Sequence, residues 1–330
     1  MNGIKVLLVC PNLEDVIQDD YMLLQKHFDV KVALFTSTRT ILKFIFTLLK
    51  GVIWSDITFS WFADIHAFLA VLFSKMLGKK SIVVIGGYEV ANVPEINYGL
   101  FCHPISAHMV KFILKYADKI LTVDEGLKKD AIKNAGTSED KIQIVPTGCD
   151  AKKFKFNGVK DDLVITVSHG YNWKKVRLKG LDTFVESAKF LPEIKFLVIG
   201  IQGEALKKLK SIATSNVDFI NPLPQDELIP YYQRAKVYCQ LSMREGLPSA
   251  LREAMLCECV PVGTSRQGIT TAIGDTGFYV PYGDPRATAE AIKKALKSDK
   301  GKIARKRIIN MFPLKRREKE LIGIIKEVLK

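Results

Sequence analysis

The fold of this 330-residue chain is decided by residues 237–263, which read VYCQLSMREGLPSALREAMLCECVPVG. This stretch begins and ends with apolar runs of strand length, at 237–241 and 259–262. Between the runs, Pro248 suits the first position of a helix, where its missing N–H leaves no hydrogen bond unmade. Apolar residues follow it at spacings of three and four. A strand, a helix and a second strand in succession predict a parallel α/β sheet.

Two carboxylates frame the predicted helix, Glu245 in the turn before it and Glu253 inside it. Gly246 lets the backbone approach a ligand closely, and the free N–H groups of the first helical turn favour an anion such as phosphate. An anion site between two carboxylates suits a ligand with a charged centre and hydroxyl-rich ends, which is the layout of a nucleotide-sugar. The alternative is an ordinary turn that carries a solvated glutamate.

The whole string is more specific than its parts. Residues 245–248 (EGLP), 253–255 (EAM) and 260–263 (VPVG) closely resemble the donor-site signature of the retaining glycosyltransferases of family four. The resemblance implies the GT-B fold, an α/β architecture of two doubly wound Rossmann-like domains facing across a cleft. It also implies a metal-independent, retaining transfer of a hexose from a nucleotide-diphosphate sugar to an acceptor hydroxyl, in the synthesis of a cell-surface glycan, glycolipid or polysaccharide. The donor is a substrate, and no cofactor is expected.

The same resemblance implies roles for individual residues. Glu245 would bond hydroxyls of the donor sugar, and Glu253 would hold the ribose hydroxyls. Further donor contacts are expected from the helix start and from two residues that meet the base: Gly246, Leu247, Pro248, Ser249, Leu223 and Pro224.

A group of cations lies between Ser168 and Gly180, in the segment HGYNWKKVRLKG. A departing diphosphate gains negative charge as its bond to the sugar breaks, so fixed cations there stabilise the transition state more than the ground state. Lys179 matches the lysine that the family places before a helix-opening glycine. Three other cations compete for the family's second basic position, and Lys175 is favoured over Lys174 and Arg177. A solvated loop is the alternative interpretation.

Chain length predicts two domains. Strand patterns occur at residues 4–10, 30–35, 57–61, 81–85, 119–123, 142–145, 163–168, 195–200 and 217–220. The proline-glycine-aspartate turn near residue 150 resembles the family's entry into the interdomain linker, and the boundary is set near Phe156. We expect an acceptor-side domain at 1–156, a donor-binding domain at 157–311 and a last helix, about 312–330, that packs back on the first domain.

Two features of the first half bear on its chemistry. The first strand is followed by Pro11 rather than by a G-x-G-x-x-G turn, which argues against a dinucleotide dehydrogenase. Glu89 follows a strand that ends in Gly86 and Gly87, and ligands of open α/β sheets bind at the carboxyl ends of strands. By resemblance Glu89 lines the cleft near the reacting sugar; the alternative is a carboxylate that caps a helix.

Charge is distributed unevenly along the chain. The net charge is +14, and all of it falls in residues 151–330, where 33 Lys/Arg face 19 Asp/Glu, against 16 and 16 in residues 1–150. Nucleic acid is not expected as a partner, because no basic motif interleaved with aromatic residues is present. An anionic membrane surface is a second possible partner. Twelve Lys/Arg against two Asp/Glu lie between Lys293 and Lys319.

The apolar stretch 39–54 carries three cations, Arg39, Lys43 and Lys50. It predicts either a helix packed in the core or a helix lying on a membrane surface. The chain shows no basic-then-apolar leader and no apolar window long enough to span a bilayer. We therefore expect a cytoplasmic protein, with peripheral binding to the inner membrane face as a hypothesis and a lipid-linked glycan as one possible acceptor.

Other chemistries are less well supported by the sequence. The six cysteines show neither zinc spacing nor a disulfide framework, and no metal site is expected. Three alternatives to a glycosyltransferase remain: a phosphorylase of the GT-B fold, a sugar epimerase, or a non-catalytic protein that binds nucleotide-sugars. Because a phosphorylase needs a phosphate site but no nucleotide, binding of a nucleoside diphosphate separates it from the transferase.

Overall fold

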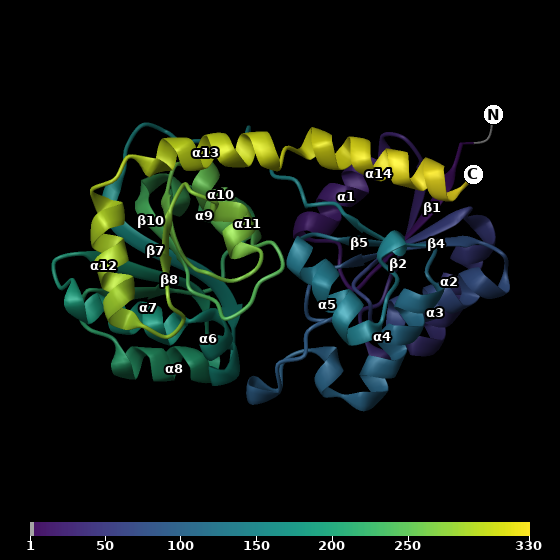
Figure 1. Ribbon diagram of the computed structural model, residues 1–330, viewed down its shortest axis with the longest axis horizontal. Helices are drawn as coiled ribbons and strands as arrows, with labels where there is room; N and C mark the ends of the chain where they lie inside the picture. Colours follow the sequence, from purple (N-terminus) through teal and green to yellow (C-terminus); the bar gives the residue numbers. More distant parts are fainter. Residues whose placement is uncertain (1–2) are drawn as a thin grey trace. The chain divides into compact units, whose positions relative to one another are not determined.

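The computed structural model describes residues 3–330 and divides them into two α/β domains (Figure 1). The first domain consists of the chain up to Gly148 together with Leu314–Lys330, and the second of Cys149–Pro313. Each domain contains one six-stranded sheet in which the paired strands are all parallel. Helices connect the strands of both sheets, so the predicted alternation of strand and helix is confirmed.

The first sheet has the order β2-β1-β3-β4-β5-β6. Its strands are β1 (Lys5–Cys10), β2 (Asp29–Leu34), β3 (Ile57–Trp61), β4 (Lys80–Ile85), β5 (Lys119–Thr122) and β6 (Ile142–Ile144). Each lies within one residue of its predicted bounds, because the central strands of a parallel sheet are continuous apolar runs. The helices of this domain are α1 (Asp15–Gln25), α2 (Ile41–Trp54), α3 (Ile65–Met76), α4 (Pro104–Tyr116), α5 (Glu125–Ala135) and α14 (Leu314–Val328).

The second sheet has the order β12-β11-β10-β7-β8-β9. Its strands are β7 (Asp161–Gly170), β8 (Lys195–Ile201), β9 (Val217–Ile220), β10 (Ala235–Gln240), β11 (Val260–Thr264) and β12 (Phe278–Val280). The strand order runs outward in one direction from β7 through β9 and in the other from β10 through β12. The boundary between β7 and β10 is therefore the topological switch point, where open sheets of this kind bind ligands.

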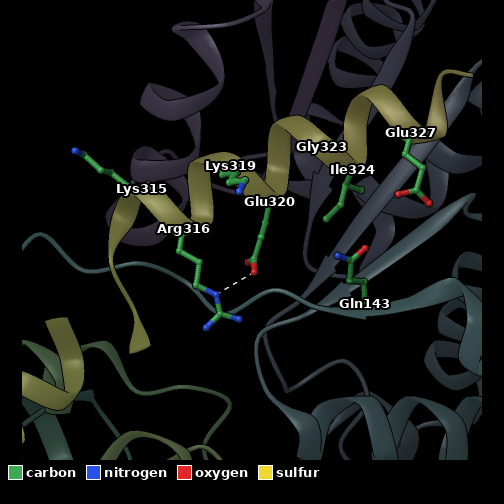
Figure 2. Close-up of a pocket in the computed structure, with 8 residues that line it drawn as sticks. All are labelled: Gln143, Lys315, Arg316, Lys319, Glu320, Gly323, Ile324 and Glu327. Carbon is green, nitrogen blue, oxygen red and sulfur yellow. Dashed lines mark hydrogen bonds and ion pairs between the residues drawn. The ribbon is translucent and has the colours of Figure 1, made fainter. Parts of the chain in front are cut away.

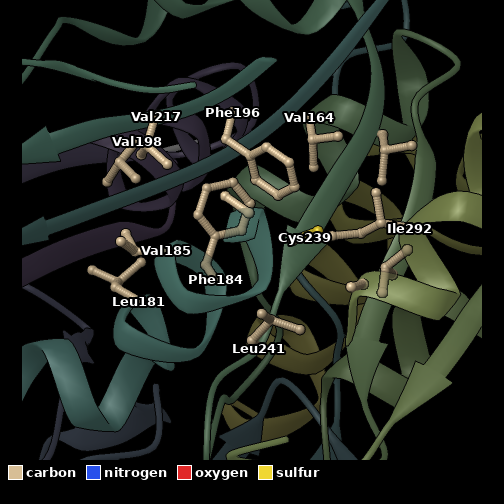
Figure 3. Close-up of a cluster of buried hydrophobic side chains, with 14 of the residues drawn as sticks. Val164, Leu181, Phe184, Val185, Phe196, Val198, Val217, Cys239, Leu241 and Ile292 are labelled. Carbon is tan, nitrogen blue, oxygen red and sulfur yellow. The ribbon is translucent and has the colours of Figure 1, made fainter. Parts of the chain in front are cut away.

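Helices cover the second sheet and complete its core. They are α6 (Trp173–Lys179), α7 (Leu181–Ser187), α8 (Gly203–Ile212), α9 (Gln225–Arg234), α10 (Ser249–Leu256), α11 (Ile269–Ile273), α12 (Pro285–Leu296) and α13 (Lys300–Met311). Figure 3 shows Phe184 of α7 packed against Phe196 of β8, with ring centroids 5.3 Å apart. The rings adopt an edge-on arrangement, which adds a directional attraction to the burial of apolar area.

Two local predictions need correction. The cationic segment before Gly180 is not a loop, because Asn172 caps a helix there and Gly180 ends it in the left-handed conformation before α7 begins. Pro248 occupies the N-cap of α10 rather than its first helical position. Just after α10, Glu258 has φ of +65°, the left-handed conformation in which a glycine commonly follows a helix.

The first residues of the interdomain linker belong to the second domain. The Cys149 amide donates to the carbonyl of Phe312 at 2.8 Å, and the Arg305 guanidinium donates to the carbonyls of Ala151 and Phe154 at 3.3 and 3.0 Å. These bonds place the start of the second domain at Cys149, eight residues before the 157 set from the sequence. The sequence could not reveal this, because the partners lie about 150 residues away.

The last helix, α14, belongs to the first domain and contacts α1. The apolar face expected for it is present, and its Leu321, Ile324 and Ile325 are buried. The same face also buries Arg317, which is 1% exposed and pairs with Asp20 of α1, itself 1% exposed. Two guanidinium nitrogens reach the two Asp20 oxygens, at 3.0 and 2.7 Å.

The Arg317 guanidinium also donates to the carbonyl of Val145, and Asp20 accepts a hydrogen bond of 2.9 Å from the indole of Trp61. Every charged atom of this pair thus has a partner, which is the condition under which a buried ion pair is tolerated. The network ties α14 to α1, to the end of β3 and to the residue after β6.

We predict that Arg317→Met destabilises the protein by about 3–5 kcal/mol, because it leaves the Asp20 carboxylate buried without its cation. Chemical denaturation of the purified variant measures this loss. Arg316→Met is the matched control, since its i,i+4 partner Glu320 lies at 2.9 Å on the exposed side of α14, and it should change stability by less than about 1 kcal/mol. Equal losses in the two variants would contradict the account.

Candidate active site

Three of the predicted site residues, Glu245, Lys175 and Lys179, follow the carboxyl ends of β10 and β7. Gln240 is the last residue of β10, and Glu245 follows it in the loop that leads to α10. β7 ends at Gly170, and α6 with Lys175 and Lys179 follows. The site therefore forms at the switch point of the second sheet, where the diverging loops leave room for a ligand.

The Glu245 carboxylate accepts three hydrogen bonds on one oxygen. Oε1 receives the Lys179 ammonium at 2.5 Å, the Ser242 hydroxyl at 2.6 Å and the Gln240 amide at 2.9 Å. The side chains of Glu245 and Lys179 are 11% and 20% exposed. A charged donor and two neutral donors on one oxygen hold the carboxylate in a single orientation.

Gln240 and Ser242 are site residues that the sequence analysis missed. Gln240 is 6% exposed and Ser242 is fully buried, and the two side chains are hydrogen-bonded to each other at 2.9 Å. The available signal was a glutamine that ends an apolar strand, since a buried polar side chain needs a partner.

Glycine at position 180 allows Lys179 to reach Glu245. Its φ is +63°, and a Cβ on this residue would lie 2.2 Å from the carbonyl oxygen of Leu241. The end of α6 therefore packs directly on the loop after β10, and the Met243 amide donates to the carbonyl of Leu178 at 2.8 Å. Only a residue without a side chain permits both the conformation and the close approach.

The structure distinguishes the three competing cations of α6. Arg177 pairs with Asp182 at 3.3 Å, and Lys174 is exposed. Burial, followed by the positive charge of Lys179, lowers the pKa of Lys175, while the Glu245 carboxylate acts in the opposite direction. Lys175 is therefore a cation of this group whose pKa responds to Lys179 and Glu245, and its role as the second basic residue stays a prediction.

Glu253 lies inside α10 and is 5% exposed. Its Oε1 accepts a hydrogen bond of 2.7 Å from the amide of Gln225, the first residue of α9. Leu223 and Pro224 immediately precede Gln225, so the predicted base-binding and ribose-binding residues are joined through this contact. The buried phenol of Tyr232 also lies near this carboxylate; its pKa is raised well above 10 by burial and, to a lesser extent, by the negative charge of Glu253.

The start of α10 is held by a buried arginine. Arg252 is fully buried and donates to the carbonyl of Pro248 at 3.4 Å and to the Ser249 hydroxyl at 3.3 Å. Gly268, with φ of +74°, packs so closely on the preceding turn that a Cβ there would lie 1.8 Å from the carbonyl oxygen of Gly246. Gly246, Leu247, Pro248 and Ser249 thus form a rigid turn whose backbone can be presented to a ligand.

Glu89, in the first domain, has a different environment. It is 3% exposed, and its oxygens accept the backbone N–H groups of Gly87, Gly86 and Ala63 at 2.7, 3.0 and 3.4 Å. Burial raises its pKa, and these three hydrogen bonds oppose the rise. The carboxylate thus fixes the loops after β3 and β4, so the alternative interpretation, a carboxylate that caps a helix, needs correction. Its role beside the reacting sugar stays a prediction.

A metal site, a membrane-spanning helix and a cavity remain to be considered. Within residues 3–330, no group of three His, Cys, Asp or Glu side chains could hold a metal ion, and no helix is long and apolar enough to cross a bilayer. A cavity of about 650 Å³ lies against α14 in the first domain (Figure 2). Its lining mixes cations such as Arg316 with carboxylates such as Glu320, and it contains none of the predicted donor residues.

Comparison with known proteins identifies the second domain. The two Rossmann-like domains constitute the GT-B fold, and residues 150–311 match the family described as glycosyl transferases group 1. The second domain therefore belongs to that family. A capsular polysaccharide biosynthesis glycosyltransferase of Staphylococcus aureus, CapM, is 30% identical over 152 residues, which are 41% of this chain and 39% of that protein. A D-inositol 3-phosphate glycosyltransferase of Corynebacterium urealyticum is 30% identical over 145 residues, 39% of this chain and 34% of that protein.

Solved structures share the fold over the whole chain. A glycosyltransferase of Rickettsia africae superposes with a TM-score of 0.77 at 17% identity and covers 100% of both chains. Anabaena Alr3699/HepE in complex with UDP-glucose gives a TM-score of 0.79 at 14% identity and covers 98% of this chain and 100% of that one. At these identities, the likeness establishes the fold.

We predict that pyrophosphate binding weakens at alkaline pH. The lowered pKa of Lys175 means that its charge is lost, and with it an attraction for the anion, at a lower pH than for an ordinary lysine. Lys175→Arg should remove the decline, because an arginine stays charged over the range from about pH 7 to about pH 10. Calorimetry across that range measures both proteins. Identical pH profiles for the two would contradict the placement of Lys175 in the anion site.

Proposed function

We propose that this protein is a retaining glycosyltransferase that moves a hexose from a nucleotide-diphosphate sugar to an acceptor hydroxyl, in the synthesis of a surface glycan, glycolipid or polysaccharide. The observation that carries the proposal is the Lys179–Glu245 contact of 2.5 Å at the switch point of a group 1 domain. In this proposal the lysine is the cation for the departing diphosphate, and the carboxylate beside it bonds sugar hydroxyls. Glu253, inside α10, is proposed as the acceptor for the ribose hydroxyls.

The donor is proposed from the ligands of related structures. Anabaena Alr3699/HepE was solved with UDP and with UDP-glucose, and the S. aureus relative bears the name of a capsular polysaccharide enzyme. A uridine diphosphate sugar is therefore the first donor to test, and a growing glycan or a lipid-linked glycan is the proposed acceptor.

The proposed chemistry follows from where charge develops. As the bond between the anomeric carbon and the diphosphate breaks, the leaving oxygen becomes more negative, and Lys179 and Lys175 stabilise it there. The resemblance to family four implies that the acceptor hydroxyl attacks from the face that the nucleotide leaves, which retains the anomeric configuration. The two lysines supply the positive charge, so the proposal requires no metal ion.

The alternative functions differ in the role that each would give to Glu253. A phosphorylase would bind phosphate at Lys179 and would have no use for a buried carboxylate suited to ribose. A sugar epimerase would need the nucleotide but no acceptor, and a non-catalytic binding protein would bind the donor without turnover. Glu253 with its amide partner favours a nucleotide ligand, and the transfer assay separates the remaining cases.

We predict that UDP stabilises the protein by about 2.7 kcal/mol at a hundredfold excess over its dissociation constant, measured as a thermal shift. Glu253→Gln should weaken UDP binding by about 1.5–3 kcal/mol, because it removes a charged hydrogen bond to ribose. Glu245→Gln should leave UDP binding equal or tighter, since UDP carries no hexose and Lys179 is released from its ion pair, yet it should lower turnover with a nucleotide-sugar.

A thermal-shift panel of nucleoside diphosphates and inorganic phosphate provides the control. Stabilisation by phosphate with none by any nucleoside diphosphate would favour the phosphorylase. Loss of UDP binding in Glu245→Gln but not in Glu253→Gln would show that the donor lies in the opposite orientation.

We also propose that the protein binds anionic membranes through one face of α2. Four large apolar side chains recur along this helix at spacings of three and four and are exposed: Leu42 (81%), Phe46 (61%), Leu49 (36%) and Ile53 (59%). Arg39 just before the helix and Lys43 and Lys50 within it are exposed beside them. The opposite face of the helix is buried against the first domain. The buried face fits the interpretation of residues 39–54 as a helix packed in the core. The exposed apolar stripe beside cations supports the proposal of a lipid surface.

The basic segment 293–319 is a weaker membrane candidate than its sequence suggests. Three of its arginines point inward: Arg305 and Arg307 donate to backbone carbonyls of their own domain, and Arg317 pairs with Asp20. Lys300 donates to the carbonyl of Asp275 at 3.0 Å. These side chains donate hydrogen bonds to groups within the protein, so the number of Lys and Arg overstates the charge available at the surface.

We predict salt-sensitive co-sedimentation with vesicles that contain phosphatidylglycerol. Lys43→Glu/Lys50→Glu should weaken it, since each cation near such a surface contributes about 1 kcal/mol, and Leu42→Ser/Phe46→Ser should weaken it by removing apolar contact. Lys302→Glu/Lys306→Glu, on exposed positions of α13, is the matched charge control and should retain binding. Loss in the control alone, or dimerisation through the stripe without vesicle binding, would overturn the proposal.

A further inference from the structure

Gln225 connects the carboxylate proposed for ribose to the segment that opens the second domain. Its Nε2 donates to Glu253 Oε1 at 2.7 Å, and its Oε1 accepts from the Lys153 ammonium at 2.6 Å. Lys153 lies four residues after Cys149, where the second domain begins, and it also pairs with Asp226 at 2.6 Å. Lys153, Gln225 and Glu253 thus form a continuous chain of polar contacts within one domain.

The contacts of Lys153 and Glu253 with Gln225 fix which way its amide points. A lysine ammonium has donors and no acceptor, so it meets the amide oxygen and leaves the NH₂ group for Glu253. An ionised carboxylate has only acceptors, so the reverse orientation of the amide would leave two unfavourable contacts. Lys153 therefore sets the orientation of the amide, and the amide in turn restrains the carboxylate of Glu253.

The surroundings of Glu253 make this restraint important. The residue is 5% exposed, and a carboxylate in such a place is held in one orientation only where its hydrogen bonds are met. Burial raises the pKa of Tyr232 and of Tyr238 well above 10 and that of Cys257 to about 12. These three neighbours therefore stay neutral across the physiological range.

We propose that Gln225 is a positioning residue for nucleoside diphosphate binding. It holds the Glu253 carboxylate in the orientation that accepts ribose hydroxyls, and Lys153 holds Gln225. The inference rests on the proposed function, because it takes Glu253 as the residue that binds ribose. Gln225 acts through Glu253, and its substitution leaves the group that touches the nucleotide in place.

Calorimetry with UDP tests the proposal. Gln225→Met removes the amide and should raise the dissociation constant by about tenfold or more, the size expected when a hydrogen bond to a charged group is lost. Lys153→Met leaves the amide free to turn and should have a smaller effect in the same direction. Gln233→Met is the matched control, because this glutamine of the same helix donates to the carbonyl of Lys155 at 2.9 Å in the same opening segment.

Gln225→Glu gives a readout that a purely structural role would not produce. Two carboxyl groups at the 2.7 Å separation of the present contact cannot both ionise easily, so they share a proton at low pH. The shared proton then replaces the amide hydrogen, and UDP should bind nearly as to the wild type at about pH 5.5. At about pH 8.5 the proton is lost and the carboxylates repel. The Lys153 ammonium, 2.6 Å from the other oxygen of residue 225, offsets part of the repulsion, and the dissociation constant should be about tenfold higher. The ratio to the wild type at the same pH cancels the titration of UDP itself.

Each outcome decides one question. Absence of binding of every nucleoside diphosphate by the wild type at any pH would reject the proposed function, and the inference with it. Wild-type binding with unchanged affinity in Gln225→Met, or a Gln225→Glu ratio that does not vary with pH, would overturn the positioning role alone. An equal loss in Gln233→Met would assign the effect to the packing of α9 rather than to the contact with Glu253.

Discussion

The second domain depends on satisfying the hydrogen bonds of two carboxylates in places where water has little access. Glu245 is held by one cation and two neutral donors on a single oxygen, and Glu253 by the amide of Gln225. Burying a charge without such partners is far more costly than the net gain from any single hydrogen bond. The partners come from β10, the loop after it, α6 and α9, so these elements can pack around the switch point in few ways. The requirement to satisfy two buried charges therefore accounts for Gly180, Gln240 and Ser242 as well as for the glutamates.

Elsewhere in both domains, arginine side chains provide the hydrogen-bond donors that backbone oxygens and a buried carboxylate need. Arg305 and Arg307 donate to backbone carbonyls in the second domain, and Arg317 joins Asp20 to a carbonyl near the end of the first sheet. The planar guanidinium has five donors in a fixed fork, so one side chain can hold several segments together. These three residues look in the sequence like part of a basic surface. In the structure they replace apolar packing at positions where loops and helix ends present unpaired oxygens.

The difference between what the sequence predicted and what it missed follows from the range of the interactions. Strands such as 57–61 and 217–220 were predicted with the bounds that the structure gives them, because a short apolar run indicates a buried strand from the local sequence alone. The EGLP turn and Lys179 were found by resemblance, which depends on short local motifs. Gln225 and Ser242 were missed, since a polar residue takes on a role only when folding brings a carboxylate beside it. The sequence favoured Lys175 over Lys174 and Arg177 without a physical reason for the choice. That reason needed the helix α6, whose geometry turns neighbouring cations in different directions.

The Lys179–Glu245 contact has a consequence for how charge is handled during binding. The two side chains lie 2.5 Å apart, so each has a partner of opposite charge within its own domain. An incoming diphosphate would compete with Glu245 for the lysine, and the carboxylate would keep the Ser242 and Gln240 donors after the exchange. Under the proposed function, the part of the binding energy that replaces the ion pair would not be expressed as affinity, but the lysine would be left on the atom where charge increases most in the transition state. Such a site would exchange ground-state affinity for stabilisation of the leaving group, and the two neutral donors on Glu245 would keep the carboxylate hydrogen-bonded during the exchange.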